Sequence, residues 1–158
     1  MNLPPFQLLL DRHGDDVLRY LRAAVGRQEA EDAWQDTMIA ALRAYPRLED
    51  DRNLRGWLLR IAHNTAIDMH RAAARRPLAL AEPPEPAVED APAAEPALWA
   101  AVRRLPDKQR AAVTLRFAGD LDYRVIGSLI DCSEVAARQN VRAGLAAVRR
   151  EWAHARAT

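Results

Sequence analysis

Residues 30–45 read AEDAWQDTMIAALRAY, and residues 54–71 read LRGWLLRIAHNTAIDMHR. In both stretches the residues suited to a core recur every three or four positions, which is the repeat of one face of an α-helix. In the first stretch this face consists of Ala30, Ala33, Trp34, Thr37, Met38, Ala41, Leu42 and Tyr45. In the second it consists of Leu54, Trp57, Leu58, Ile61, Ala62, Thr65 and Met69. The sequence therefore predicts two amphipathic helices.

A polar loop, PRLEDDRN, separates these two helices. Pro46 ends the first helix because proline cannot donate the backbone hydrogen bond that a helix interior needs. Asp50, Asp51 or Asn53 can cap the second helix, since their side-chain oxygens accept from its first N–H groups. Upstream, a weaker apolar repeat predicts a further helix over residues 5–25.

The chain then changes character over residues 76–96, RPLALAEPPEPAVEDAPAAEP, which are rich in Pro, Ala and acidic residues. Such a segment cannot bury enough apolar surface to fold and indicates a flexible linker. No run of the sequence alternates as a half-buried strand does. The expected fold is therefore all-α, with two small helical domains at residues 3–75 and 97–155.

The second domain ends in a helix, a short turn and a longer helix, which is the helix-turn-helix pattern. The first of these helices spans about 122–130, and the second runs from an N-cap at Ser133 to about residue 154. In this motif the first turns of the second helix meet base edges in the major groove. Helix geometry directs Glu134, Ala137, Arg138 and Arg142 outward, and Val135, Val141, Leu145 and Val148 toward the core.

The formal net charge of +1 does not favour a purely electrostatic nucleic-acid binder. This average conceals an asymmetry. Residues 1–75 carry 11 basic and 11 acidic side chains, residues 76–96 carry 1 and 5, and residues 97–158 carry 11 and 6. The three segments thus have net charges of 0, −4 and +5, so the second domain is the basic one.

The sequence has no pattern typical of a catalytic or metal site. His63 and His70 lie ~10.5 Å apart along a helix, too far to bind one ion, and there is no phosphate loop or nucleophile elbow. Cys132 is the single cysteine, and no stretch approaches the ~20 apolar residues of a membrane span. The N-terminus does not resemble a signal peptide. We expect a cytoplasmic protein that is no enzyme and needs no cofactor or metal.

Residues 30–45 and 54–71, in this order, resemble the promoter-melting domain, region 2, of extracytoplasmic-function sigma factors, group 4 of the sigma-70 family. Residues 105–151, LPDKQRAAVTLRFAGDLDYRVIGSLIDCSEVAARQNVRAGLAAVRRE, are similar to region 4, the family's C-terminal helix-turn-helix domain. The resemblance implies a protein that binds core RNA polymerase and directs promoter-specific initiation by recognising and melting promoter DNA.

The resemblance also implies partners and site residues. The partners are the β′ clamp helices and β flap of core polymerase, promoter DNA and an anti-sigma factor. The residues implied for core binding are Asp32, Gln35 and Asp36. Those implied for the minus 10 element are Asn53, Arg55, Trp57, Arg60, His63, Asn64 and Arg71. Those expected to read the minus 35 element are Ser133, Glu134, Ala137, Arg138 and Arg142.

The second domain departs from the family pattern at several positions. Gly127 stands where the family has Ala, and glycine lowers helix propensity by roughly 1 kcal/mol. Asp131 replaces the glycine of the turn, although Asp tolerates a left-handed backbone. Residues 135–137 replace a stretch that usually contains Gly and Thr, and Gly144 interrupts an Arg-rich end. These departures predict a weakened motif of low DNA affinity.

Two other functions stay open on the sequence alone. The chain could be a sigma-like protein that binds an anti-sigma factor without initiating transcription. It could also be a helix-turn-helix regulator that binds duplex DNA by itself. The stretches AEDAWQD and GWLLRIAHN argue against the regulator, because a regulator needs neither a polymerase contact nor a loop that captures a flipped base.

Overall fold

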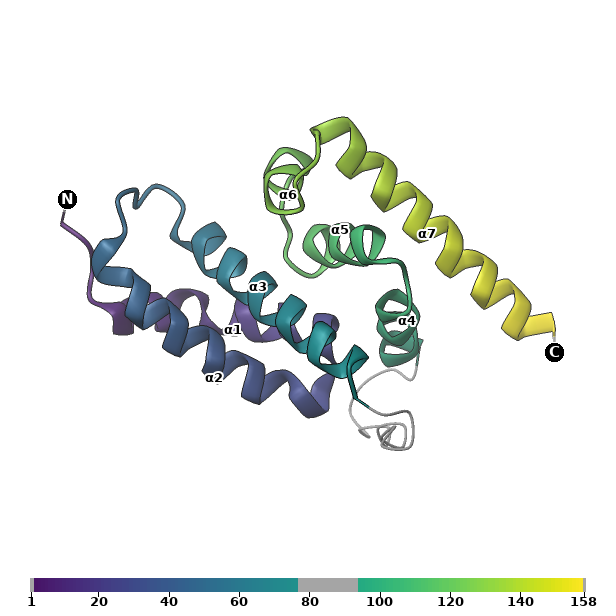
Figure 1. Cartoon of the computed structure of the whole chain (residues 1–158), viewed down its shortest axis with the longest axis horizontal. Coiled ribbons are helices and arrows are strands. Elements are labelled where there is room, and N and C mark those ends of the chain that lie inside the picture. The colour runs from purple at the N-terminus through teal and green to yellow at the C-terminus, as the bar shows by residue number, and fades with distance from the viewer. Residues whose placement is uncertain (1, 77–93, 158) are drawn as a thin grey trace. The chain divides into compact units, whose positions relative to one another are not determined.

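The computed structural model of the chain describes residues 2–76 and 94–157, which contain helices and no strands (Figure 1). The chain divides into two compact units, residues 1–85 and 86–158. The expected all-α fold with two small domains is thereby confirmed. Residues 77–93, most of the expected linker, lie outside the described residues.

The first unit is a bundle of three helices that all pack on one another: α1 (Phe6–Val25), α2 (Arg27–Ala44) and α3 (Leu54–Ala74). Between α1 and α2 the chain turns at Gly26, whose φ of 88° favours glycine. The Trp34 indole Nε1 of α2 donates to the Gly14 carbonyl of α1 at 3.0 Å. The largest buried side chains of this unit are Leu9, Val17, Tyr20, Leu21, Thr37, Leu58 and Leu59.

The apolar repeat predicted both long helices but not the full width of their buried faces. On α3, Leu59, His63 and Ala66 are buried although the predicted face omitted them. The reason is that α3 contacts both α1 and α2, so a wider arc of the helix is covered. On α2 the inward position expected for Leu42 is wrong, because its side chain is 55% exposed. Leu42 lies ~100° around the helix from the buried Ala41, on the outer side.

The second unit contains α4 (Ala94–Arg103), α5 (Asp107–Phe117), α6 (Tyr123–Leu129) and α7 (Glu134–Ala157). Helix α4 begins three residues before the expected domain start, which corrects the linker at residues 94–96. Pro96 is compatible with this start because the N–H groups of a first helical turn have no intrahelical partner.

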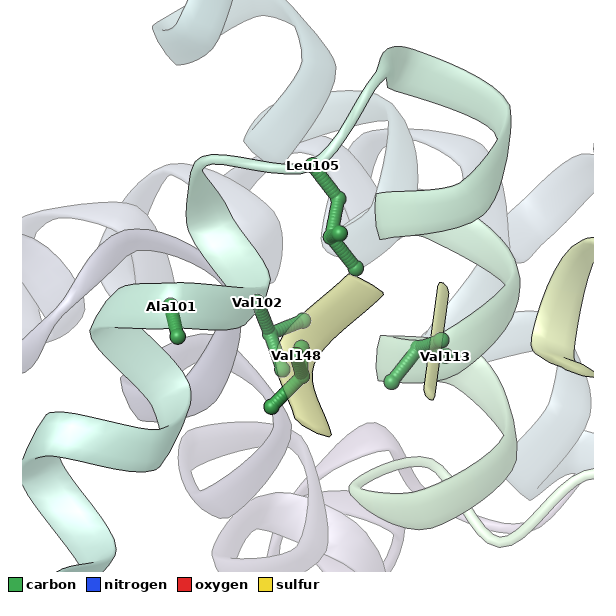
Figure 2. Close-up of a cluster of buried hydrophobic side chains, with 5 residues drawn as sticks. All are labelled: Ala101, Val102, Leu105, Val113 and Val148. Atoms are coloured by element: carbon green, nitrogen blue, oxygen red, sulfur yellow. The ribbon is translucent and has the colours of Figure 1, made fainter. Parts of the chain in front are cut away.

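Helices α4, α5 and α7 and the turn between α4 and α5 meet in one apolar cluster (Figure 2). Its members are Ala101, Val102, Leu105, Val113 and Val148. A Cβ atom added to Gly144 of α7 would lie 2.7 Å from Val113 Cγ2 and 3.2 Å from Leu105 Cδ1. Gly144 therefore lets α7 approach α5 closely, and it does not interrupt a basic surface as the sequence suggested.

The turn between α6 and α7, which form the helix-turn-helix, is held by backbone and side-chain hydrogen bonds within it. Asp131 adopts the left-handed conformation with φ 56°, as expected, and the Cys132 N–H donates to the Gly127 carbonyl at 2.9 Å. Ser133 caps α7, because its Oγ accepts from the Ala136 N–H at 3.0 Å. A Cβ atom on Gly127 would lie 2.6 Å from the Cys132 carbonyl oxygen. The turn thus needs a glycine at position 127, and this residue does not weaken the motif.

We predict that Gly127→Ala lowers the free energy of unfolding by about 1–3 kcal/mol, because the new methyl group collides with backbone of the turn. Helix propensity alone gives the opposite sign, a gain of roughly 1 kcal/mol. Chemical denaturation of the full chain measures the change.

The matched control is Gly14→Ala in α1, where the added Cβ meets Trp34 only at an ordinary distance of 3.6 Å. This control should leave stability unchanged or raise it. A stabilising Gly127→Ala would show that the turn tolerates a side chain and that our account of the motif is wrong.

Candidate nucleic-acid interface

The loop between α2 and α3 is ordered by its own polar side chains. After α2 the chain forms a short 3-10 helix, Tyr45–Arg47. The Arg52 backbone N–H and guanidinium both donate to the Asp50 carboxylate, with the shortest contact at 2.8 Å. These bonds lower the pKa of Asp50 to about 2. Asn53 is the cap of α3, since its Oδ1 accepts from the Gly56 N–H at 2.9 Å.

Three aromatic side chains, Phe6, Tyr45 and Trp57, pack together at the two ends of this loop. The Tyr45 ring lies 5.4 Å from the Phe6 ring and 6.0 Å from the Trp57 ring, measured between centroids. The Tyr45 hydroxyl donates to the Pro4 carbonyl oxygen. Trp57 is half-buried in this group. Its packing role is therefore established, whereas its contact with DNA stays a prediction.

Arg55, which the resemblance implies as a DNA contact, is ion-paired within the unit. Its Nε lies 2.9 Å from Asp16 Oδ2 on α1, and its side chain is mostly covered. Hydrogen bonding from Arg55 lowers the pKa of Asp16 despite the opposing effect of partial burial. This contact fixes the first turn of α3, and thus the end of the loop, to α1.

His63 cannot contact DNA in this conformation, because its side chain is only 4% exposed. Burial, followed by the charge of Arg60, lowers the pKa of His63 to about 4, so the imidazole is neutral at pH 7. The expectation of a DNA contact at His63 is therefore wrong for the structure as it stands. The resemblance aligned a motif position without revealing that the side chain at it is buried.

The other implied positions of α3 lie on one exposed face. Arg60, Asn64 and Arg71 are spaced by four and seven residues and are all exposed. Asn53, at the start of the same helix, is also exposed although its Oδ1 serves as the cap. Two arginines and two amides therefore line the surface that continues from the loop.

The implied core-binding residues share the outer face of α2. Asp32, Gln35 and Asp36 are exposed, and Ile39, one turn further on, is a 50% exposed apolar side chain on the same face. The opposite face carries Ala33, Thr37 and Ala41, which are buried. The solvent-facing side of α2 is thus polar, with one apolar side chain, Ile39, beside the polar ones.

On α7 the structure corrects the predicted faces. Ala137 is fully buried and Val135 is 60% exposed, the reverse of the expectation. The buried row is Ala137, Val141, Gly144 and Val148, with helical spacing, and residue 135 lies on the other side of it. Ala137 is therefore withdrawn as a reader of DNA. Ser133, Glu134, Arg138 and Arg142 are exposed.

Three contacts that organise these surfaces, made by Asp16, Tyr45 and Tyr123, are not predicted by the sequence. Asp16 pairs with Arg55 across 39 residues, and Tyr45 joins Pro4 across 41 residues. Tyr123 lies against arginines from two other helices. No local spacing signals contacts between elements so far apart in the sequence.

Within residues 2–76 and 94–157, no three His, Cys, Asp or Glu side chains are grouped to hold a metal ion. In the same residues, no helix is both long and apolar enough to cross a membrane.

Comparison with known proteins decides the family. Residues 9–76 match the model of sigma-70 region 2, and residues 96–148 match that of sigma-70 region 4. The RNA polymerase sigma-H factor of Pseudomonas aeruginosa is 30% identical over 154 residues, covering 86% of this chain and 80% of that protein. The chain belongs to the extracytoplasmic-function sigma factors of the sigma-70 family. Its function is to bind core RNA polymerase and direct promoter-specific initiation.

Further relatives agree with this family. The sigma-E factor of Haemophilus influenzae is 28% identical over 153 residues, covering 86% of this sigma factor and 81% of that protein. Among solved structures, RpoE of Bartonella quintana, in complex with the anti-sigma factor NepR, has a TM-score of 0.72 at 18% identity, covering 94% of this chain and 96% of that one. CnrH, in complex with the cytosolic domain of CnrY, has a TM-score of 0.70 at 22% identity and covers 94% and 88%. These structures share the fold.

We predict that the imidazole of His63 titrates near pH 4 in the folded sigma factor. Between pH 6.5 and about 4 the unfolded chain takes up a proton that the folded chain does not, so the free energy of unfolding falls as the pH falls through this window. The NMR shift of the His63 ring proton, assigned by its loss in His63→Leu, measures the midpoint. A midpoint near 6.5 would show that the ring reaches solvent and would restore it as a possible DNA contact.

Proposed function

We propose that the two units of this sigma factor divide the work of initiation among three surfaces. The outer face of α2 binds the β′ clamp helices of core polymerase. The loop before α3 and the exposed face of α3 take the melted minus 10 strand. The first turns of α7 read the minus 35 duplex, and the second unit also meets the β flap. The observation that carries this proposal is that the α2 residues of the family motif are exposed together, opposite the core.

The core-binding surface rests on Asp32, Gln35 and Asp36. Two carboxylates and one amide on one exposed face favour a basic partner surface, and the nearby Ile39 offers apolar area beside them. Charged and hydrogen-bonding pairs set the register of an interface, while buried apolar contacts supply much of its affinity. Both kinds of group are present on this face.

The minus 10 surface consists of Asn53, Arg60, Asn64 and Arg71, with Trp57 and Arg55 behind them. Holding a base out of the stack costs a few kcal/mol and requires a pocket with polar groups at the base edges. Arginines neutralise phosphates, and amides can read base edges. Arg55 acts in this proposal through its ion pair with Asp16, which holds the loop in place.

The minus 35 surface consists of Ser133, Glu134, Arg138 and Arg142 at the start of α7. The excess of basic over acidic side chains in residues 97–158 suits a duplex-binding unit. Because Gly127 and Asp131 fit the turn, the motif can hold α7 in the orientation that a recognition helix needs.

We also propose that an anti-sigma factor regulates this chain and that it works in the cytoplasm, where its polymerase is. A structure of the same fold, RpoE of Bartonella quintana, was solved as a complex with the anti-sigma factor NepR. The chain contributes binding energy to initiation and no chemical step of its own.

We predict that the double variant Asp32→Asn, Gln35→Ala binds core polymerase at least about tenfold more weakly, because interface anchors of this kind are worth more than ~1 kcal/mol each. Competition against labelled wild-type chain for core enzyme measures the loss. The matched control is Asp15→Asn, which removes one exposed carboxylate from α1 of the same unit. Equal affinities of the double variant and the wild type would remove α2 from the interface.

A transcription assay then tests the function as a whole. Purified chain, core polymerase and a promoter library should together yield transcripts from a defined set of promoters. Tight core binding without transcripts would instead indicate a sigma-like partner protein. Specific binding to duplex DNA in the absence of core would indicate a stand-alone regulator.

A further inference from the structure

Tyr123, the first residue of α6, lies beneath two guanidinium groups. The Arg116 Cζ of α5 is 4.6 Å from the centre of the Tyr123 ring, and the Arg138 Cζ of α7 is 4.9 Å from it. Both distances are within the range of a cation–π interaction. One ring therefore links three helices of the second unit through two cations.

The two arginines differ in what else holds them. Arg116 is half-buried, and its Nη1 donates to the Leu121 carbonyl of the turn before α6 at 3.0 Å. Arg138 has a side chain that is 44% exposed, and its Nη2 lies 3.7 Å from the Glu134 carboxylate one turn earlier. Arg116 is thus held by the packed part of the unit, whereas the more exposed Arg138 can reach a partner in solvent.

A stacked arginine is ordered without losing its hydrogen bonds. The ring contacts the flat face of the guanidinium, while the N–H donors point outward in its plane. Two of these donors can then meet a phosphate or the O6 and N7 atoms of a guanine. An exposed arginine that is already ordered also loses less side-chain entropy when DNA binds.

We propose that Tyr123 is a positioning residue for minus 35 recognition: its ring, held by Arg116, orients Arg138 of α7 so that the guanidinium edge faces the DNA. The inference rests on the proposed function of Arg138. It adds a residue on the preceding helix that acts on the DNA through Arg138.

The stack itself is tested in the free full-length chain by NMR. Ring currents should shift the Arg138 side-chain protons upfield in the wild type and in Tyr123→Phe, which keeps the ring. In Tyr123→Leu the shift should be lost, with the unfolding midpoint and the amide spectrum of the first unit as controls for folding. Tyr123→Met replaces the leucine variant if that one does not fold. Arg138 shifts that are the same with and without the ring would overturn the inference.

The role in recognition is tested with the reconstituted holoenzyme and a promoter that it transcribes. Tyr123→Leu should weaken binding about two- to fivefold, as expected for loss of one cation–π contact at an exposed site. Tyr123→Phe should bind as the wild type does. The loss caused by Tyr123→Leu should disappear on a promoter whose minus 35 element is scrambled.

A double-mutant cycle separates the inference from the function on which it rests. The pair Tyr123→Leu, Arg138→Ala should bind no more weakly than Arg138→Ala alone. Additive losses would show that Tyr123 acts independently of Arg138 and would overturn the inference only. An Arg138→Ala variant that keeps full preference for the minus 35 element would contradict the proposed role of Arg138 and the inference together.

Discussion

The contacts of Tyr45 fix the ends of the loop before α3, which is the part of the first unit proposed to take the melted minus 10 strand. Its hydroxyl binds the Pro4 carbonyl, and its ring packs between the Phe6 and Trp57 rings, so the N-terminal segment, the end of α2 and the start of α3 share one anchor. The loop between Tyr45 and Asn53 therefore begins and ends at fixed points. The Asp16–Arg55 pair fixes the second of these points to α1 as well. A short polar loop can hold a flipped base only when its ends do not move, because otherwise the cost of unstacking is added to the cost of ordering the loop.

The sequence predicted the helices well because their apolar repeat is long and their ends carry clear signals. Asn53, one of the three candidate caps, begins α3, Ser133 caps α7 as expected, and Pro46 lies where α2 gives way to a 3-10 turn. The repeat was less informative about which residues are covered. His63 was assigned to DNA and is buried, while Val135 was assigned to the core and is exposed. A helical repeat gives the direction of one apolar stripe, but packing against two neighbours widens or rotates the covered arc, and only the tertiary structure reveals that.

The candidate site was predicted to a smaller extent. Family resemblance supplied the positions on α2 and α3, and helix geometry supplied those on α7. Most of these residues are exposed in the structure. Gly127 was expected to weaken the helix-turn-helix, whereas the close approach of the Cys132 carbonyl requires a glycine there. The supporting contacts of Asp16, Tyr45 and Tyr123 could not be predicted, because each joins separate segments of the chain. Rigid support for exposed polar groups is the common feature of both units, and it depends on contacts between segments that are separate in the sequence.

We propose above all that the loop and exposed face of α3 hold the melted strand once the polymerase is bound. Permanganate reactivity of thymines in the minus 10 region tests it most directly, since permanganate attacks thymines that are no longer stacked in duplex DNA. Holoenzyme formed with the wild-type chain should make these thymines reactive, and holoenzyme with Asn64→Ala, Arg71→Ala should bind the same promoter with much less reactivity. Equal reactivity with the wild-type and variant chains would contradict the account, and so would a promoter that stays closed with the wild type.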